Sequence, residues 1–240
     1  MKKTLKIMVL YPKEMNTYYD LGNLLAIKHR AELHGFNVKE IFYEPGNKFD
    51  TSVDIIIGGG GQDYEQNLVI NDLQKISSSL KKISNSGTPI LVICELYQLF
   101  GHYIEKQAGE KLNGIGIFDA YTELGSKRFT GNIVTESDDF GKIIGYENHN
   151  GRTYLNNNQV SLTRVKKGIG NNGHDGVEGC RVNNTFGSYI HGPLLPKNPR
   201  LTDELIRLAV NKKFGKFSPN VNIDDSIIEK ARKIAGRRPR

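Results

Sequence analysis

The stretch Pro89-Ile90-Leu91-Val92-Ile93-Cys94-Glu95-Leu96-Tyr97-Gln98-Leu99-Phe100-Gly101 decides the fold. Its apolar run ends at Cys94, and a helix-like segment begins immediately afterwards. A strand that turns sharply into a helix is how α/β enzymes expose a nucleophile. The helix dipole at such a turn favours the thiolate of a cysteine. A second interpretation stays open, in which Cys94 is only a small buried apolar side chain.

Strand-like and helix-like segments alternate on both sides of this stretch. Short apolar runs predict strands, and wider apolar spacing predicts helices at 17–33 and 63–84. The predicted strands cover 5–11, 36–43, 53–57 and 89–93. This alternation predicts an α/β fold, with a mostly parallel sheet and helices on both of its faces.

The second half of the chain has a different pattern. From 113 to 191 glycine and asparagine are frequent and apolar runs are short, so we expect short strands and functional loops. Helical spacing returns at 201–210 and 223–235. We therefore expect one domain over 1–215, followed by a linker and a basic C-terminal helix or tail over 216–240.

Composition narrows the class of protein. The 240 residues are 38% hydrophobic and 25% charged, which is ordinary for a globular protein. Cys94 and Cys180 lie too far apart to suggest a disulfide framework, and no membrane span or export signal is expected, so we predict a cytoplasmic protein. Much of the +7 net charge lies in 230–240. We interpret that run as a solvated face rather than a nucleic-acid site; docking on a partner or an anionic membrane stays open.

A glycine loop and a late histidine complete the candidate site. Gly58-Gly59-Gly60-Gly61 follows a predicted strand, where backbone amides can approach a ligand or an oxyanion; a flexible turn is the alternative. In a parallel sheet this loop and Cys94 share one edge. His191 is the candidate base, or else a packed histidine. No spacing suggests a metal site or a phosphate-binding P-loop.

Taken together, these segments resemble the class I (triad-type) glutamine amidotransferases and, within them, the cobyric-acid-synthase-like branch. The resemblance is closest to the glutaminase subunits of lipid II isoglutaminyl synthases (the GatD type). Any one segment is weak, but their order and spacing are specific. Besides the stretch around Cys94, the segments that carry the resemblance are 11–12, 15–23, 58–63, 145–149, 170–173 and 187–199.

The resemblance implies roles for individual residues. Cys94 would attack the side-chain amide of glutamine and form a thioester, while His191 would take the thiol proton, protonate the departing ammonia and then activate water. The amides of Gly60 and Glu95 would hold the oxyanion. The residues implied to hold the amino-acid end of glutamine are Gln98 and Arg128.

The resemblance also implies a partner. The ammonia would pass to a Mur-ligase-like subunit of a heterodimer, which amidates the α-carboxyl of D-glutamate in lipid II during peptidoglycan synthesis. This chain would need no cofactor, whereas the partner would use ATP and Mg²⁺. Lipid II would be reached through the partner, which brings the complex to the inner face of the membrane.

Two positions depart from the family pattern. Val92 and Leu96 stand where the elbow around the nucleophile usually has glycines. Pro193 replaces a glutamate that often follows the histidine, as in the cobyric-acid-synthase-like branch, and leaves the group that orients His191 unidentified. Two alternatives therefore stay open: the same chemistry for another acceptor such as a corrinoid, and a catalytically inactive interaction subunit.

Overall fold

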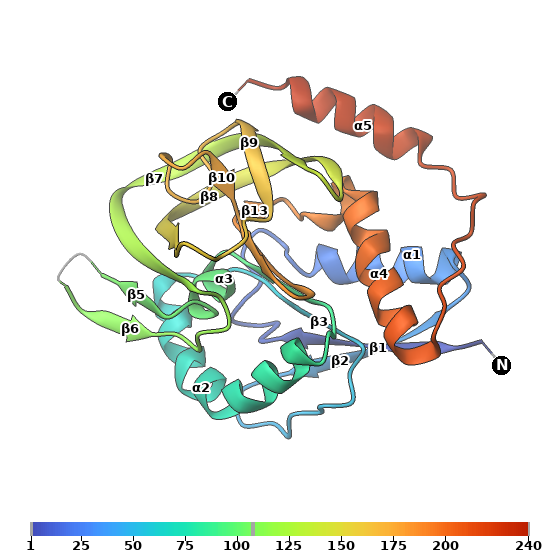
Figure 1. Cartoon of the computed structure of the whole chain (residues 1–240), viewed down its shortest axis with the longest axis horizontal. Coiled ribbons are helices and arrows are strands. Elements are labelled where there is room, and N and C mark those ends of the chain that lie inside the picture. The colour runs from blue at the N-terminus through green and yellow to red at the C-terminus, as the bar shows by residue number, and fades with distance from the viewer. Residues whose placement is uncertain (1, 107–108, 240) are drawn as a thin grey trace.

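The computed structural model describes residues 2–106 and 109–239 (Figure 1). A six-stranded sheet forms its centre, in the order β11-β12-β4-β3-β1-β2. All neighbours in it are parallel except β11, which runs antiparallel to β12. The strands are β1 (Thr4–Leu10), β2 (Asn37–Tyr43), β3 (Ile55–Gly58), β4 (Ile90–Ile93), β11 (Cys180–Val182) and β12 (Thr185–Ser188).

The central strands are apolar because both faces of the sheet are covered. Every residue of β3 and β4 is buried. The helices α1 (Gly22–Leu33) and α4 (Pro199–Phe214) contact each other (Figure 1). The crossovers from β1 to β2 and from β3 to β4 run in opposite directions across the sheet, so right-handed connections put α1 and α2 (Asp63–Asn85) on opposite faces. The predicted fold class is confirmed.

The first helix begins later than its sequence pattern predicts. It starts at Gly22 rather than at Thr17, because the preceding residues form a loop. Tyr18 and Tyr19 in that loop have positive φ values of 59° and 62°, which a helix does not allow. The loop lies at the edge of the sheet where β1, β3 and β4 end, and it contributes to the site described below.

A second sheet occupies much of the region from 113 to 191. Its centre is an antiparallel pair, β7 (Ala120–Ser137) and β8 (Gly141–Leu155), of 18 and 15 residues. The expectation of only short strands there is wrong. A register shift between Leu124 and Phe129 and many polar positions interrupt the apolar alternation that would reveal long strands. The remaining strands of this sheet are β5 (Tyr103–Glu105), β6 (Lys111–Asn113), β9 (Thr163–Lys167), β10 (Val177–Glu178) and β13 (Ile190–His191).

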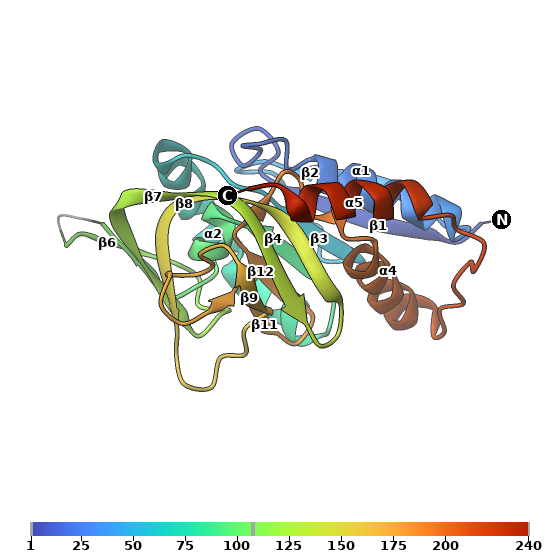
Figure 2. The same cartoon turned by 90° about the horizontal axis from the view of Figure 1, so that it is seen from above.

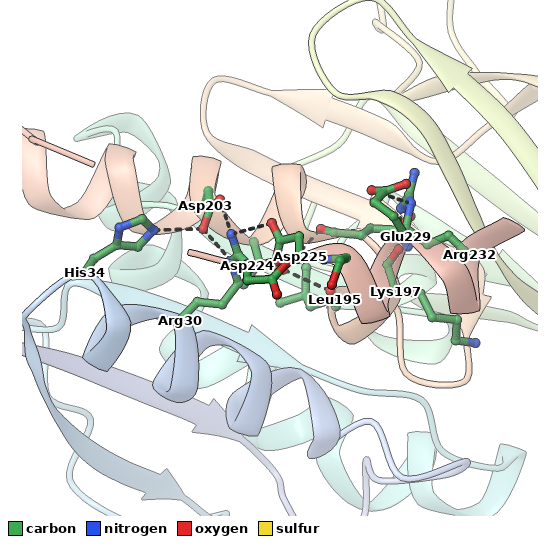
Figure 3. Close-up of polar contacts among 12 residues, drawn as sticks. Arg30, His34, Leu195, Lys197, Asp203, Asp224, Asp225, Glu229 and Arg232 are labelled. Atoms are coloured by element: carbon green, nitrogen blue, oxygen red, sulfur yellow. Dashed lines mark hydrogen bonds and ion pairs between the residues drawn. The ribbon is translucent and has the colours of Figure 1, made fainter. Parts of the chain in front are cut away.

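The C-terminal segment folds back over the molecule. The helix α5 (Ser226–Arg237), the red helix of Figures 1 and 2, contacts β7, β8 and the short helix η1 (Leu195–Lys197). Arg30 of α1 fixes the connection to α5: its guanidinium donates to Asp203 at 2.6 Å and to Asp225 at 2.7 Å (Figure 3). Arg232 of α5 donates to the carbonyl of Lys142 at 2.7 Å. Part of the basic run is therefore packed against the domain rather than solvated.

No helix in the described part of the chain is both long enough and apolar enough to cross a bilayer. The domain boundary predicted at 215 falls just after the end of α4, at Gly215, whose φ of 92° ends the helix.

Candidate active site

The predicted strand–cysteine–helix turn is confirmed. Cys94 connects β4 to α3 (Glu95–Leu99). Its backbone angles, φ 53° and ψ −109°, are ones that residues other than glycine rarely adopt. Two backbone hydrogen bonds hold it there: the Cys94 N–H donates to the carbonyl of Ser188 at 2.8 Å, and the Gln98 N–H donates to the Cys94 carbonyl at 3.0 Å. Such strained residues cluster at functional sites.

The elbow forms although Val92 and Leu96 replace its usual glycines. Val92 lies in register between Gly58 of β3 and Gly187 of β12. A Cβ on Gly58 would come within 2.3 Å of the Leu96 side chain, and one on Gly187 within 2.2 Å of the Tyr97 ring. The glycines on the neighbouring strands thus leave the room that α3 needs to pack closely against the sheet.

Asp20 is the group that orients His191. The His191 Nδ1 atom lies 3.4 Å and 3.3 Å from the two carboxylate oxygens of Asp20, and both side chains are only 1% exposed. An Nδ1–H that donates to the carboxylate leaves the Nε2 lone pair free to accept a proton. Nε2 is buried and has no hydrogen-bond partner among the described residues. The imidazole therefore has the tautomer and orientation of a general base.

Gly60 is the point around which the predicted residues meet. A Cβ at this position would lie 3.0 Å from Cys94 Cβ, 3.0 Å from His191 Cε1 and 2.6 Å from Glu95 Oε2. Only glycine leaves room for all three side chains. The structure thus brings Gly60 and His191, which lie far apart in the sequence, to the adjacent residues Cys94 and Glu95.

The amides of the glycine loop are already engaged. The Gly60 N–H donates to Asp20 Oδ2 at 2.8 Å, and the Gly61 N–H donates to Glu95 Oε2 at 2.8 Å. The role of the Gly60 amide in holding an oxyanion stays a prediction, and the Gly61 amide points to the same region. The Glu95 side chain is a feature that the sequence pattern did not reveal. Burial raises the pKa of this carboxyl above its ordinary value.

The surroundings of the Cys94 thiol favour its protonated form. Burial raises its pKa well above the ordinary value, and the carboxylates of Glu95 and Asp20 raise it further, whereas Arg128 lowers it. Burial and the two carboxylates thus oppose the thiolate that the turn is expected to favour, and α3, with five residues, is a short helix. A base such as His191 is needed to take the thiol proton.

A cavity of about 440 Å³ opens in front of Cys94, within the size range of small-molecule sites. Arg128 lines it and makes no ion pair with any described carboxylate, so its charge is available to a ligand. The Tyr18 ring stands edge-on to the His191 ring, with 5.0 Å between centroids, and the Tyr18 hydroxyl accepts a hydrogen bond from the Asn148 amide. The lining residues are Thr17, Tyr18, Gly61, Gln62, Tyr64, Cys94, Glu95, Arg128, Asn148 and Asn150.

Gln98 does not line this cavity. It is buried behind the nucleophile, where its Oε1 accepts from the Gln66 amide at 3.1 Å, and a Cβ on Gly151 would lie 2.5 Å from its Nε2. The contact with the amino-acid end of glutamine that the resemblance implies for Gln98 stays a prediction.

Residues 6–199 match the CobB/CobQ-like glutamine amidotransferase domain. The chain belongs to this family. It is 42% identical to the GatD subunit of the glutamine-hydrolysing lipid II isoglutaminyl synthase of Staphylococcus aureus (strain N315), over 92% of this chain and 90% of that protein. The same subunit of Streptococcus pneumoniae (strain ATCC BAA-255 / R6) is 38% identical, over 88% of this chain and 82% of that protein.

Among solved structures, the amidotransferase resembles PurLQS from Thermotoga maritima, with a TM-score of 0.58 and 20% identity, over 86% of this chain and 98% of that one. At that identity the likeness concerns the fold alone. The predicted family, fold class and enzyme class are confirmed.

Sequence reasoning missed Asp20, although a signal was present. Asp20 lies in the segment 15–23, which carries part of the family resemblance, and it is an acidic residue in a loop at the sheet edge. The residues directly after the histidine, Gly192 and Pro193, offer no carboxylate. The orienting carboxylate instead comes from 171 positions earlier in the chain.

Proposed function

We propose that this amidotransferase is the glutamine-hydrolysing subunit of a lipid II isoglutaminyl synthase, and that it works through a Cys94 thioester. The observation that carries the proposal is the grouping of Cys94, His191 and Asp20 around Gly60, beside a cavity that Cys94 and Arg128 line. The names of the S. aureus and S. pneumoniae relatives support the assignment of the complex.

The groups suffice for hydrolysis of an amide. The His191 Nε2 takes the Cys94 proton as sulfur attacks the side-chain carbonyl carbon of glutamine, and the carbonyl oxygen becomes an oxyanion. The imidazolium then gives its proton to the departing nitrogen, so ammonia leaves and a thioester remains. Water, deprotonated by His191, attacks the thioester; glutamate leaves and the thiol is regenerated. Asp20 stabilises the imidazolium in both stages, and Arg128 faces the α-carboxylate of the substrate.

The partner in this proposal is a Mur-ligase-like subunit that forms a heterodimer with the amidotransferase. It would use ATP and Mg²⁺ to activate the α-carboxyl of D-glutamate in lipid II, and it would receive the ammonia directly. A direct transfer is needed because ammonium in bulk water near neutral pH is protonated and a poor nucleophile. The complex would work in the cytoplasm at the inner face of the membrane, where the partner holds lipid II.

The first experiment measures glutamate release and lipid II amidation by the complex, with Cys94→Ala beside Cys180→Ala. Both cysteines are buried, but Cys180 lies on β11, so its variant controls for the loss of a buried thiol. We expect Cys94→Ala to abolish glutamine-dependent activity and to retain ammonia-dependent amidation. Loss of both activities in Cys94→Ala alone would contradict this division of labour. Glutamate release without amidation of lipid II would favour another acceptor, such as a corrinoid.

A further inference from the structure

Glu95 follows the nucleophile directly, and its side chain turns back into the site instead of pointing to solvent. We propose that the Glu95 carboxyl occupies the oxyanion hole of the resting enzyme, and that glutamine must displace it before the thioester can form. This inference rests on the proposed glutaminase chemistry and adds to it one step, the displacement of the Glu95 carboxyl.

The geometry of the carboxyl supports this placement. Its Oε2 accepts a hydrogen bond from the Gly61 N–H at 2.8 Å, and the Glu95 N–H lies close enough to lower the pKa of the same carboxyl. These are an amide of the glycine loop and the amide next to the nucleophile, a pair of donors suited to a developing oxyanion. Gly60 has no side chain to keep the carboxyl away, since a Cβ there would lie 2.6 Å from Oε2. Glu95 is also only 5% exposed, so bulk water competes little for its carboxyl.

Charge makes this occupation exclusive. An ionised carboxylate and the tetrahedral oxyanion carry the same sign and need the same donors, so they cannot share a buried site. The Glu95 carboxyl also accepts a hydrogen bond from the thiol and disfavours the thiolate. The resting arrangement therefore disfavours both the nucleophile and the intermediate. Glutamine reacts only when its carbonyl replaces the carboxyl, which swings away or is protonated.

No other acidic side chain of the described residues takes this position. Asp20 also lies near the thiol, but its carboxylate is held by His191 and by the Gly60 amide. Arg128 acts in the opposite direction, because it lowers the pKa of the thiol. The charged groups that act on the Cys94 thiol are thus Glu95, Asp20 and Arg128, and His191 lies beside Gly60 next to Cys94.

The first test compares the glutaminase activity of the complex in wild type, Glu95→Gly and Glu95→Gln. The matched control is Glu123→Gln, at an exposed position of β7. Removing one oxyanion donor from an enzyme typically costs about 10²–10³ in kcat. Freeing such a donor should therefore raise kcat/KM of Glu95→Gly by about tenfold or more over wild type. Glu95→Gln should fall between wild type and Glu95→Gly, and Glu123→Gln should match wild type. Equal or lower activity in Glu95→Gly would overturn the proposal.

The second test needs no glutaminase activity. The rate of Cys94 alkylation by iodoacetamide is followed against pH by peptide mass spectrometry, which separates Cys94 from Cys180. Loss of the anion at position 95 should move the midpoint of the Glu95→Gln profile to lower pH by about one unit or more. An unchanged midpoint would overturn the proposal. Absence of glutamate release from every variant would instead count against the proposed function, and the alkylation profile would still decide the position of Glu95.

Discussion

The pairing of His191 with Asp20 predicts a specific loss of rate in Asp20→Asn. The asparagine keeps an oxygen that can accept from the Gly60 N–H, so the glycine loop retains its support. The amide no longer carries the charge that stabilises the imidazolium, and its NH₂ group favours the wrong tautomer of His191. The substitution therefore weakens His191 as a base and leaves the hydrogen bond that supports the glycine loop in place.

The magnitude follows from the contact that is lost. Hydrogen bonds to charged groups contribute about 1.5–3 kcal/mol, which corresponds to about 10- to 150-fold in rate. The His191–Asp20 distances of 3.3–3.4 Å are longer than the shortest ion-paired hydrogen bonds, which favours the lower half of that range. We expect kcat for glutamate release to fall by about 10- to 45-fold, with kcat/KM falling in parallel.

The assay is glutamate release by the complex, with ammonia-dependent amidation as an internal control that should not change. Asp72→Asn is the matched variant, because Asp72 is also buried and accepts from the hydroxyls of Tyr11 and Tyr43 at 2.9 Å, away from Cys94. It should lower the melting temperature but leave kcat unchanged. A kcat for Asp20→Asn within about threefold of wild type would refute the orienting role of Asp20.

Three further predictions follow from other parts of the structure. Arg128→Ala should raise KM for glutamine by about 10-fold or more with little change in kcat, whereas Lys127→Ala should not; equal effects would contradict a carboxylate contact. Burial raises the pKa of Glu178 from 4.5 to about 8. Its contribution to the free energy of unfolding is therefore present below pH 4.5 and lost as pH rises towards 8, at about 1.4 kcal/mol per pH unit. In denaturant titrations Glu178→Gln should flatten that decline, and an unchanged slope would exclude Glu178 as its source. Asp225→Asn should loosen α5, so that a protease cuts the connection between α4 and α5 faster than in wild type. The Asp224→Asn variant should be cut at the wild-type rate.

The sequence predicted the parts of the fold that have local signals. The buried strands β1, β3 and β4 read as apolar runs, and Cys94 stands where such a run meets a helix. The long pair β7 and β8 was not recognised, because long-range pairing of mixed polar strands has no comparable local period.

The site was predictable only as a set of separate residues. Cys94 and His191 stood out by type and context, and the sheet topology explained why the glycine loop lies beside Cys94. The Asp20 contact joins loops 171 positions apart, and the Glu95 contact depends on a side-chain direction. Neither property has a spacing rule in the sequence, so only the folded structure reveals them.

The packing of α3 against Gly58 and Gly187 has a consequence for changing this enzyme. Leu96 lies over the first glycine and Tyr97 over the second, so these positions form two interlocked pairs that join two strands, β3 and β12, to one helix, α3. Restoring a glycine at Leu96 alone would leave a hole, at a cost of about 2–5 kcal/mol for a lost core side chain. Adding a side chain at Gly58 alone would force α3, and the nucleophile with it, off the sheet. The two changes are tolerable only together, so redesign of this turn has to exchange whole pairs.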